Sequence, residues 1–500
     1  MLGLHVGGLV APGIDGWQKI AAMRNESHVV RRWKRTSKRF AMPSWSLSAL
    51  LPRASDALPA FALQRRLSRL DRMRRAEILE LQQLRLRSIL DFAAERSPFY
   101  RRRWRGRAPV PNEFRDIEPV CKQELFIEGL DDALTEGSVR REHLGRWIGV
   151  PDAPYVVLST SGTTGEPAIV PYSRAEWVRG LAHMLRAQTR FASGVFRLLR
   201  TWSRFAQLTT ENPVHLTTRL GQSFDVFPIR RLSIAASAPL PEQIQKLERF
   251  QPVTLAGYPS AIDSLAKTAV EGRLRIRPRV ILTGGESSSL AFRDRVRHAW
   301  NSEVFDCYGL TETLVIAFEC PLHEGLHIDE DAAVLEVVDD QDRPVPHGDT
   351  GKAVLITNLY FRTLPVIRYR VDDVLAVTEE PCRCGLPWAR ILKIDGRRGE
   401  FLTLRTRDGS SATIHISAIE AALDATPGLR RFQVKHENGK VRIIVLARRE
   451  NEAQEVGRRA RDAVLAALQP HRLGPNAVDV EVPTTLSELR GLTDKRTRFT

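Results

Sequence analysis

A short run of hydroxyl-bearing residues and glycines is the strongest chemical signal in the sequence. It reads Ser159-Thr-Ser-Gly-Thr-Thr-Gly-Glu-Pro167 and directly follows a strand expected at 155–158. Glycines let backbone N–H groups approach an anion closely, and hydroxyls donate further hydrogen bonds, so the loop is suited to binding phosphate. It is not a Walker loop, because no Gly-Lys-Ser/Thr end follows. A run of this composition alone is also typical of a flexible turn. The predicted phosphate-binding residues are Ser159, Thr160, Ser161, Gly162, Thr163, Thr164 and Gly165.

Two further motifs combine glycine with an acidic residue. They read Thr283-Gly-Gly-Glu286 and Tyr308-Gly-Leu-Thr-Glu312. A carboxylate is a hard oxygen ligand, so Glu312 is suited to hold a Mg²⁺ ion that is already bound to phosphates. Each motif is also compatible with a tight turn that serves the fold alone.

Four residues in two short motifs have the chemistry of a metal site. Cys320-Pro-Leu-His323 and Cys382-Arg-Cys384 together offer three thiolates and one imidazole. Such a set closes a tetrahedron around Zn²⁺ and leaves no position open for water, which is typical of a structural site. We therefore predict a zinc site made of Cys320, His323, Cys382 and Cys384, with His323 preferred because Cys-x2-His is a short clip. His327 competes for the fourth position, and reduced cysteines without metal are the alternative.

The motifs at 159–167, 283–286 and 308–312 together resemble those of the adenylate-forming (acyl-activating) enzymes. The resemblance is closest to the branch of phenylacetate–CoA ligases and capsule-associated homologues. It covers about residues 75–500 and begins with a helix that ends in Phe92-Ala-Ala-Glu-Arg-Ser-Pro-Phe-Tyr100.

The resemblance implies a role for each nucleotide-binding residue. It implies that Tyr308 packs on adenine, that Thr311 contacts the α-phosphate and that Glu312 holds Mg²⁺. It also implies that the loop at 283–286 lines the adenine pocket. The nucleotide-binding residues that it predicts beyond the hydroxyl-rich loop are Gly285, Glu286, Tyr308, Gly309, Asp373 and Arg397.

Two of these residues come from a second part of the chain. Ile367-Arg-Tyr-Arg-Val-Asp-Asp373 resembles the family's ribose-binding motif, so Asp373 is expected to accept hydrogen bonds from two ribose hydroxyls. Asp372 stands where the pattern has glycine. Arg397 matches an arginine that contacts the nucleotide at the domain boundary. Gly399 stands at the family's hinge position, where glycine tolerates large changes of φ and ψ.

The catalytic lysine implied by the resemblance lies near the end of the chain. Family members carry there a lysine that binds the carboxylate and the phosphate during adenylation. Lys495 fits this role by position, although Asp494 stands where the family has glycine. Lys440 is the competitor, but its sequence Asn438-Gly-Lys440 is typical of a β-hairpin turn.

The elements that must position these residues alternate between short β-rich runs and helical patterns. The runs at 155–158, 280–282 and 334–338 are expected strands, so the fold is expected to be α/β with loops at strand ends available for chemistry. Residues 65–96 are expected to form one helix that Pro98 stops, with its arginines facing solvent.

The organisation expected is a large domain followed by a small one. Gly396-Arg-Arg-Gly-Glu400 separates the α/β body from a last stretch with alternating β and helical patterns. We expect a large, multi-layered ATP- and acyl-binding domain at 61–395 and a small, mobile α+β domain at 396–500. Residues 1–60 lie outside the resemblance and are expected to be an appendage.

The formal net charge of +16 is concentrated near the beginning of the chain. Residues 1–108 hold 23 Lys/Arg and 8 Asp/Glu, so the remaining residues are near neutral and nucleic-acid binding by the whole body is disfavoured. The run Arg31-Arg-Trp-Lys-Arg35 is expected to be a solvated tail or a segment that binds a membrane surface or an acidic partner. We find no run of 18 apolar residues, which predicts a protein without a spanning helix.

These observations predict an enzyme that joins an acid to a thiol at the expense of ATP. The resemblance implies that a carboxylic acid, aryl or arylacetic by family analogy, attacks Mg·ATP to give acyl-AMP and pyrophosphate, and that the acyl group then passes to CoA. The expected cofactors are ATP, Mg²⁺, CoA and a structural Zn²⁺. The alternatives are transfer to an amine or a carrier-protein thiol, release of the adenylate, and a non-catalytic nucleotide-binding protein.

Overall fold

The computed structural model describes most of the chain from residue 56 to residue 482. The described residues are 56–150, 153–160, 167–191, 203–209, 214–224, 229–236, 238–397, 401–416, 419, 422–423, 426–437, 440–447, 449–469, 472–473 and 478–482. The expected appendage at 1–60 therefore lies outside the described residues except for its last five. Those five belong to the body, because Ala57 and Ala60 are fully buried and Asp56 forms an ion pair with Arg174.

The first part of the body is helical. Its elements are α3 (Ala57–Leu67), η1 (Leu70–Arg72), α4 (Arg75–Arg96), α5 (Pro98–Arg103), η2 (Pro111–Asp116), a π-helical turn η3 (Gln123–Glu128), α6 (Leu130–Ala133) and α7 (Arg141–Trp147). The single helix expected at 65–96 is thus divided by η1. The apolar face expected within it is confirmed, since Leu86, Ile89, Leu90 and Ala93 are buried. The chain turns from α4 into α5 at Pro98, as a proline at the first helical position favours.

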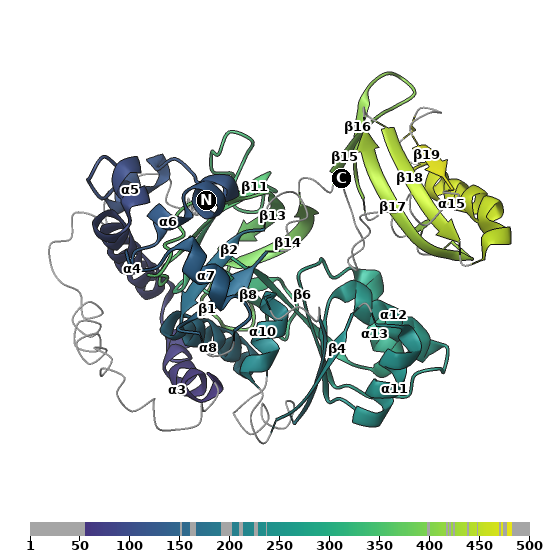
Figure 1. Ribbon diagram of the computed structural model, residues 1–500, viewed down its shortest axis with the longest axis horizontal. Helices are drawn as coiled ribbons and strands as arrows, with labels where there is room; N and C mark the ends of the chain where they lie inside the picture. Colours follow the sequence, from purple (N-terminus) through teal and green to yellow (C-terminus); the bar gives the residue numbers. More distant parts are fainter. Residues whose placement is uncertain are drawn as a thin grey trace, which may run out of the picture.

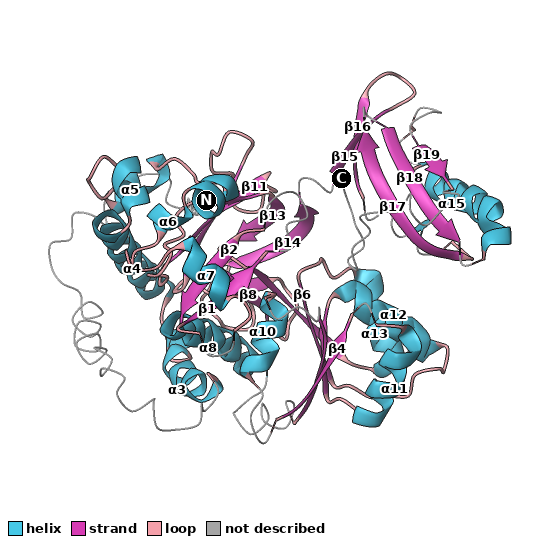
Figure 2. Ribbon diagram, viewed as in Figure 1, coloured by secondary structure: helices cyan, strands magenta, loops and turns pink. Residues whose placement is uncertain are grey.

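A nine-stranded sheet in the order β13-β14-β9-β8-β7-β6-β5-β3-β4 dominates the body (Figures 1 and 2). The adjacent pairs from β4 to β7 along this order are parallel. The adjacent pairs from β7 to β13, which include β8, β9 and β14, are antiparallel. The parallel strands are β3 (Arg204–Thr209), β4 (Arg230–Ala235), β5 (Thr254–Gly257), β6 (Val280–Gly284) and β7 (Glu303–Leu310). The antiparallel strands are β8 (Leu314–Glu319), β9 (Leu326–Ile328), β13 (Asp373–Thr378) and β14 (Arg390–Arg397).

Helices connect the parallel strands, as crossover connections require. They are α10 (Leu216–Ser223), α11 (Leu240–Phe250), α12 (Pro259–Val270) and α13 (Leu290–Trp300). Figure 1 shows α11, α12 and α13 together next to β4. Their apolar residues bury a core against the sheet that includes Leu208, Leu255, Ile281 and Val296. Ser289 caps α13, because its hydroxyl accepts a hydrogen bond from the amide of Phe292.

Two smaller sheets complete the body. Strands β1 (Tyr155–Ser159) and β2 (Ile169–Ser173) form an antiparallel pair that brackets the hydroxyl-rich loop. Strands β10 (Ala333–Val338), β11 (Ala353–Asn358) and β12 (Tyr369–Val371) form a second sheet. Helix α8 (Arg174–Phe191) follows β2 directly. The strands predicted at 155–158, 280–282 and 334–338 are confirmed as β1, β6 and β10.

Residues 401–482 form a unit with its own core, visible as a separate lobe in Figure 1. It contains β15 (Phe401–Arg405), β16 (Ser411–His415), β17 (Leu429–Glu437), β18 (Lys440–Ala447), η5 (Glu450–Glu452), α15 (Ala453–Ala467) and β19 (Val478–Glu481). Helix α15 makes the crossover between β18 and β19, which are parallel. The fold is therefore a large α/β unit followed by a small α+β unit.

No helix within the described part of the chain is long and apolar enough to cross a membrane.

Candidate active site

The turn between β7 and β8 carries the predicted Mg²⁺-binding and phosphate-contacting residues. Gly309 lies where the two strands approach most closely, since a Cβ at this position would be 2.4 Å from the carbonyl oxygen of Leu314. A glycine is therefore required for the hairpin that holds Thr311 and Glu312. The hydroxyl of Tyr172 on β2 donates to the carbonyl oxygen of Thr311, so the turn is fixed to the β1–β2 pair that brackets the hydroxyl-rich loop.

Tyr308 and Asp373 are joined directly, although they are far apart in the sequence. The phenol of Tyr308 donates to Oδ2 of Asp373 over 2.6 Å. Burial and the adjacent carboxylate raise the pKa of Tyr308, so the phenol keeps the proton that it donates. The two residues predicted to contact adenine and ribose therefore share one place in the structure.

Arg397, the last residue of β14, contacts the same carboxylate. In the β13–β14 pair, Asp373 lies opposite Arg397, and Nε of Arg397 is 3.3 Å from Oδ1 of Asp373. Asp372, which replaces the glycine of the family pattern, has a side chain that is 63% exposed and lies 3.7 Å from Nε of Arg370. The extra charge at this position is therefore directed to solvent and leaves the Asp373–Arg397 contact intact.

Glu312 is a buried carboxylate that accepts a hydrogen bond from the phenol of Tyr369 over 3.0 Å. Burial raises the pKa of Glu312 above its usual range, because the charged form loses hydration. The hydrogen bond from Tyr369 and the charges of Arg397 and Lys122 oppose this rise. A hard divalent cation would compensate the buried charge, so the environment of Glu312 fits Mg²⁺.

The loop after β6 is shaped by two of its predicted residues. Gly285 has φ of +78°, and a Cβ there would lie 3.1 Å from the ring of Tyr258, so a side chain would be strained and crowded. Glu286 accepts hydrogen bonds of 3.1 Å from both the amide and the hydroxyl of Ser260 at the start of α12. Glu286 thus holds the loop against α12, beside the Tyr308 motif on the neighbouring strand β7.

Of the hydroxyl-rich loop at 159–167, the structure describes Ser159, Thr160 and Pro167. The amide of Thr160 donates to the carbonyl oxygen of Ala168, and the amide of Ala168 donates to the hydroxyl of Thr160. The amide of Ser159 donates to the carbonyl oxygen of Val214, just before α10. The loop therefore starts from a fixed base. The predicted residues Ser161, Gly162, Thr163, Thr164 and Gly165 lie outside the described residues.

The two candidate lysines differ in what the structure describes. Lys495 and the hinge residue Gly399 lie outside the described residues. Lys440 is the first residue of β18, exposed and paired with Glu437 across the β17–β18 hairpin. This position agrees with the hairpin predicted for Lys440.

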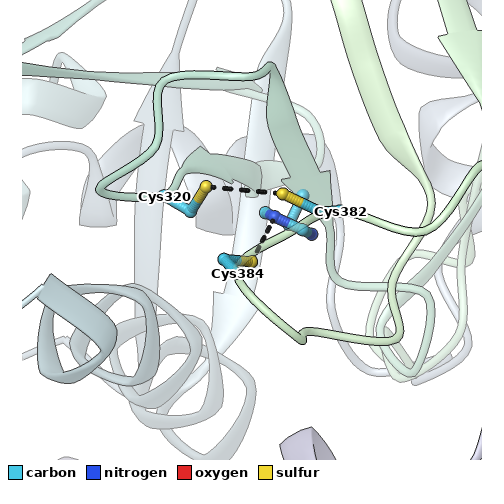
Figure 3. A group of neighbouring side chains, drawn as sticks. Cys320, Cys382 and Cys384 are labelled. Atoms are coloured by element: carbon cyan, nitrogen blue, oxygen red, sulfur yellow. Dashed lines mark hydrogen bonds between the residues drawn. The ribbon is translucent and has the colours of Figure 1, made fainter.

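The cysteine motifs do form a cluster, but its histidine is His327. Sγ of Cys320 is 3.8 Å from Sγ of Cys382, and Sγ of Cys384 is 3.3 Å from Nε2 of His327 (Figure 3). All four ligand atoms lie within 4.8 Å of one another. The prediction of His323 as the fourth member is therefore wrong.

His323 is directed elsewhere by a tight turn. Its φ is +54°, and its amide donates to the carbonyl oxygen of Cys320, so the Cys-x2-His clip closes on the backbone. Its Nδ1 lies 3.2 Å from Oε1 of Glu319, and its ring packs on Phe305. His327 reaches the thiols because β9 pairs with β14, directly after the loop that carries Cys382 and Cys384.

The protonation chemistry of the cluster fits a metal cation. Burial, with the charges of Arg190 and Arg390, lowers the pKa of His327 to about 4, which keeps the imidazole in the neutral form that binds metal. Burial raises the pKa of Cys384 to about 12 and also raises that of Cys320. Close thiols that resist ionisation need a cation to become thiolates, and Zn²⁺ is the ion that this donor set suits.

Comparison with known proteins agrees with this arrangement. Residues 115–362 match the family model of the AMP-binding enzymes. Phenylacetate-coenzyme A ligase of Thermus thermophilus is 28% identical over 375 residues, which are 72% of this chain and 78% of that protein. Protein CapK of Staphylococcus aureus is 21% identical over 340 residues, 66% of this chain and 70% of that protein.

The chain belongs to the adenylate-forming enzymes. Its place is on the phenylacetate–CoA ligase branch. Among solved structures, 2-hydroxyisobutyryl-CoA ligase in the postadenylation state aligns with a TM-score of 0.57 over 85% of this chain and 89% of that chain, at 21% identity. The α/β architecture with a large sheet is therefore that of the adenylate-forming fold.

A second cluster in this adenylate-forming enzyme consists of residue types that can bind a metal ion. An arginine side chain already occupies the position between its carboxylates. His183, Asp329 and Asp331 are buried together beside the end of β9. The guanidinium of Arg186 lies between the two carboxylates, 2.6 Å from Asp329 and 2.7 Å from Asp331. The positive charge that a metal would supply comes from this arginine, so the cluster is a buried ion-pair network.

Sequence reasoning missed this network because it placed the arginines of 65–96 in solvent. Arg75 pairs with Glu330, and Arg85 pairs with Asp331 at the same turn after β9. The signal in the sequence was the acidic triplet 329–331, which follows an apolar strand and needs cations once buried.

Proposed function

We propose that this enzyme activates a carboxylic acid with ATP to an acyl adenylate, releases pyrophosphate, and transfers the acyl group to the thiol of CoA. The observation that carries the proposal is the convergence of Tyr308, Glu312, Asp373 and Arg397 at one end of the sheet. The family of the chain supports the same chemistry.

The first half-reaction makes a poor electrophile reactive. A carboxylate oxygen attacks the α-phosphorus of ATP, a new P–O bond forms, and the bond to the β-phosphate breaks so that pyrophosphate leaves with its electron pair. The acyl group then has AMP as its leaving group. The protein must stabilise negative charge spread over the phosphates and the attacking carboxylate, which preorganised donors do best.

The described residues would form two groups, one that binds the nucleoside of ATP and one that binds its phosphates. Asp373, oriented by Tyr308 and Arg397, would accept hydrogen bonds from the ribose hydroxyls. The crowded loop at Gly285 would bound the adenine. Glu312 would hold Mg²⁺, which when bound neutralises phosphate charge. The hydroxyl of Thr311, whose carbonyl Tyr172 fixes, would contact the α-phosphate.

The second half-reaction requires the acyl adenylate to meet CoA. Attack of the thiolate on the acyl carbon forms the thioester and expels AMP. We assign Gly399 as the hinge about which the small domain turns between the two steps, and Lys495 as the residue that serves only the first. An aryl or arylacetic acid is the proposed substrate class. Transfer to an amine or a carrier-protein thiol is the alternative second step.

We also propose that the group Cys320, His327, Cys382 and Cys384 binds a structural Zn²⁺. Four protein ligands leave no position for substrate, so the ion would support the fold rather than the reaction. It would tie the segment after β8 to the segment before β14, which ends at Arg397 in the nucleotide site.

The test is to supply CoA, Mg·ATP and a panel of carboxylic acids, and to identify products by mass spectrometry. Wild-type enzyme is expected to form an acyl-CoA with at least one acid.

Lys495→Ala is expected to form acyl-AMP about 10²–10³-fold more slowly, because one preorganised charge is lost. The same variant should convert supplied acyl-AMP to acyl-CoA at the wild-type rate. If both half-reactions survive equally, Lys495 has no such role and Lys440 is tested next. Accumulation of acyl-AMP without any acyl-CoA would reject CoA as the acceptor.

A further inference from the structure

A surface cavity of about 600 Å³ lies at the ends of the parallel strands that are opposite the nucleotide site. Its walls are formed by the residue after α11, the segment after α12 and the end of α13. These segments lead into the beginnings of β5, β6 and β7, whereas Gly285 and Glu312 follow the other ends of β6 and β7. The cavity is therefore separate from the proposed ATP site, and its size is that of a site for a small molecule.

Three basic side chains line this cavity without a partner of their own. Arg275 and Arg277 alternate with the buried Leu274 and Ile276, so both arginines lie on the exposed side of the segment after α12. His298 is exposed in the last turn of α13. Within the described part of the chain, none of these three side chains forms a hydrogen bond or an ion pair, and no carboxylate lines the cavity. The cavity thus gathers positive charge without an internal counter-charge.

The helix C-termini beside the cavity do not account for these basic side chains. Arginine and histidine often donate to the free carbonyl groups at the end of a helix. Here the carbonyl oxygen of Arg297 in α13 accepts from the amide of Asn301. Nε2 of Gln251 donates to the carbonyl oxygens of Glu248 in α11 and of Arg275, over 2.8 and 2.9 Å. These carbonyl groups have other donors, so the guanidinium groups are left for a ligand.

The indole of Trp300 adds a hydrogen-bond donor to the same wall. Trp300 lines the cavity and is only 9% exposed. Its Nε1 is buried and has no hydrogen-bond partner among the described residues. Buried donors of this kind are rare, because an N–H group that loses water without gaining an acceptor destabilises the fold. An oxygen atom of a ligand in the cavity would supply this acceptor.

We propose that this cavity binds the phosphate group of a phosphorylated small molecule, at a site separate from the one that binds ATP. A phosphate monoester carries close to two negative charges at neutral pH, which matches the two guanidinium groups of Arg275 and Arg277. The planar fork of each guanidinium suits phosphate oxygens, and His298 and Trp300 can donate from the wall formed by α13. The inference goes beyond the proposed function, because it uses no residue of the adenylation site.

The experiment compares wild-type protein with two double variants. Arg275→Gln/Arg277→Gln removes two charges from the cavity wall. The matched control Arg273→Gln/Arg279→Gln removes two charges from the same segment, but from exposed arginines that do not line the cavity. Calorimetric titrations at constant ionic strength use inorganic phosphate, ribose 5-phosphate and acetate. A separate titration with Mg·ATP reports on the nucleotide site.

Arg275→Gln/Arg277→Gln is expected to weaken binding of the phosphate probes about tenfold or more and to leave Mg·ATP binding within about twofold of wild type. The control variant should bind every probe as wild type does. Tighter binding of ribose 5-phosphate than of phosphate would identify an ester as the ligand, and equal binding would identify free phosphate. Equal weakening in both double variants would overturn the proposal, because it indicates attraction by diffuse charge. Acetate binding as tight as phosphate binding, or no binding of either phosphate probe at millimolar concentration, would also overturn it.

Discussion

Glu312→Gln is expected to slow acyl-AMP formation by about 10²–10³. The amide has nearly the shape of the carboxylate and its oxygen still accepts the hydrogen bond from Tyr369, so the hairpin between β7 and β8 should fold. Only the negative charge that would hold Mg²⁺ is lost. The Mg²⁺ concentration that gives half of the maximal rate should therefore rise as the rate falls. Initial rates of adenylate formation across a Mg²⁺ titration measure both quantities.

Two controls separate loss of the charge from loss of the fold. Glu303→Gln changes an exposed glutamate at the beginning of β7, the strand that leads to the turn with Glu312, and should leave the rate and the Mg²⁺ dependence unchanged. Tyr369→Phe removes only the hydrogen bond to Glu312 and should cost about tenfold or less. A Glu312→Gln enzyme with the wild-type rate and Mg²⁺ dependence would show that this carboxylate does not hold the ion.

Cys382→Ser is expected to release one Zn²⁺ per chain and to lower the melting temperature by about 10 °C. The thiol is one of the four proposed ligands, 3.8 Å from Sγ of Cys320, and its loss removes the binding energy of the metal from the folded state. Activity should fall only where folding fails, because a closed site leaves no position for substrate. Elemental analysis and calorimetric melting measure the two effects.

The histidine variants decide which side chain completes the site. His327→Ala should lose the metal as Cys382→Ser does, whereas His323→Ala should keep it, because His323 contacts Glu319 and Phe305. Cys121→Ser, which changes an exposed cysteine outside the cluster, should keep both metal and melting temperature. Wild-type protein prepared without chelators that contains no zinc would contradict the site, and zinc retained in His327→Ala would restore His323 as the ligand.

Residue type and spacing predicted those parts of the site that are local in the sequence. The hydroxyl-rich loop and the motif at 308–312 could be found because their chemistry is contained within a few consecutive residues. The strand at 155–158 and the buried face of α4 followed from hydrophobic periodicity. Asp373 and Arg397 were found through a family resemblance, but nothing in their spacing shows that β13 and β14 set them opposite each other.

The errors arose where long-range pairing decides the outcome. His327 was placed second because the short Cys-x2-His clip is the stronger local pattern, while the pairing of β9 with β14 brings His327 to the thiols. The break between α3 and α4 has a similar cause. Asp71 in η1 accepts hydrogen bonds from Arg190 and from the indole of Trp388, and neither partner is visible from the helix itself. Tertiary contacts of this kind override helical periodicity.

The departures of the sequence from the family pattern matter less where the structure describes them. Asp372 is directed to solvent, so it leaves the Tyr308–Asp373–Arg397 contacts in place. Gly399 and Asp494 lie outside the described residues. The remaining alternative is a non-catalytic nucleotide-binding protein. A measurement of adenylation decides between this alternative and an enzyme, because the Tyr308–Asp373–Arg397 contacts are intact in either case.

ATP–pyrophosphate exchange in the presence of Mg²⁺ and a panel of aryl, arylacetic and aliphatic acids tests adenylation most directly. Reversal of the first half-reaction moves labelled pyrophosphate into ATP only when a carboxylate has formed an acyl adenylate, so CoA and its alternatives do not affect the result. We expect exchange that depends on at least one acid and that falls about 10²–10³-fold in Glu312→Gln. Binding of Mg·ATP without exchange for any acid in the panel would contradict this expectation and would establish the protein as a nucleotide-binding one.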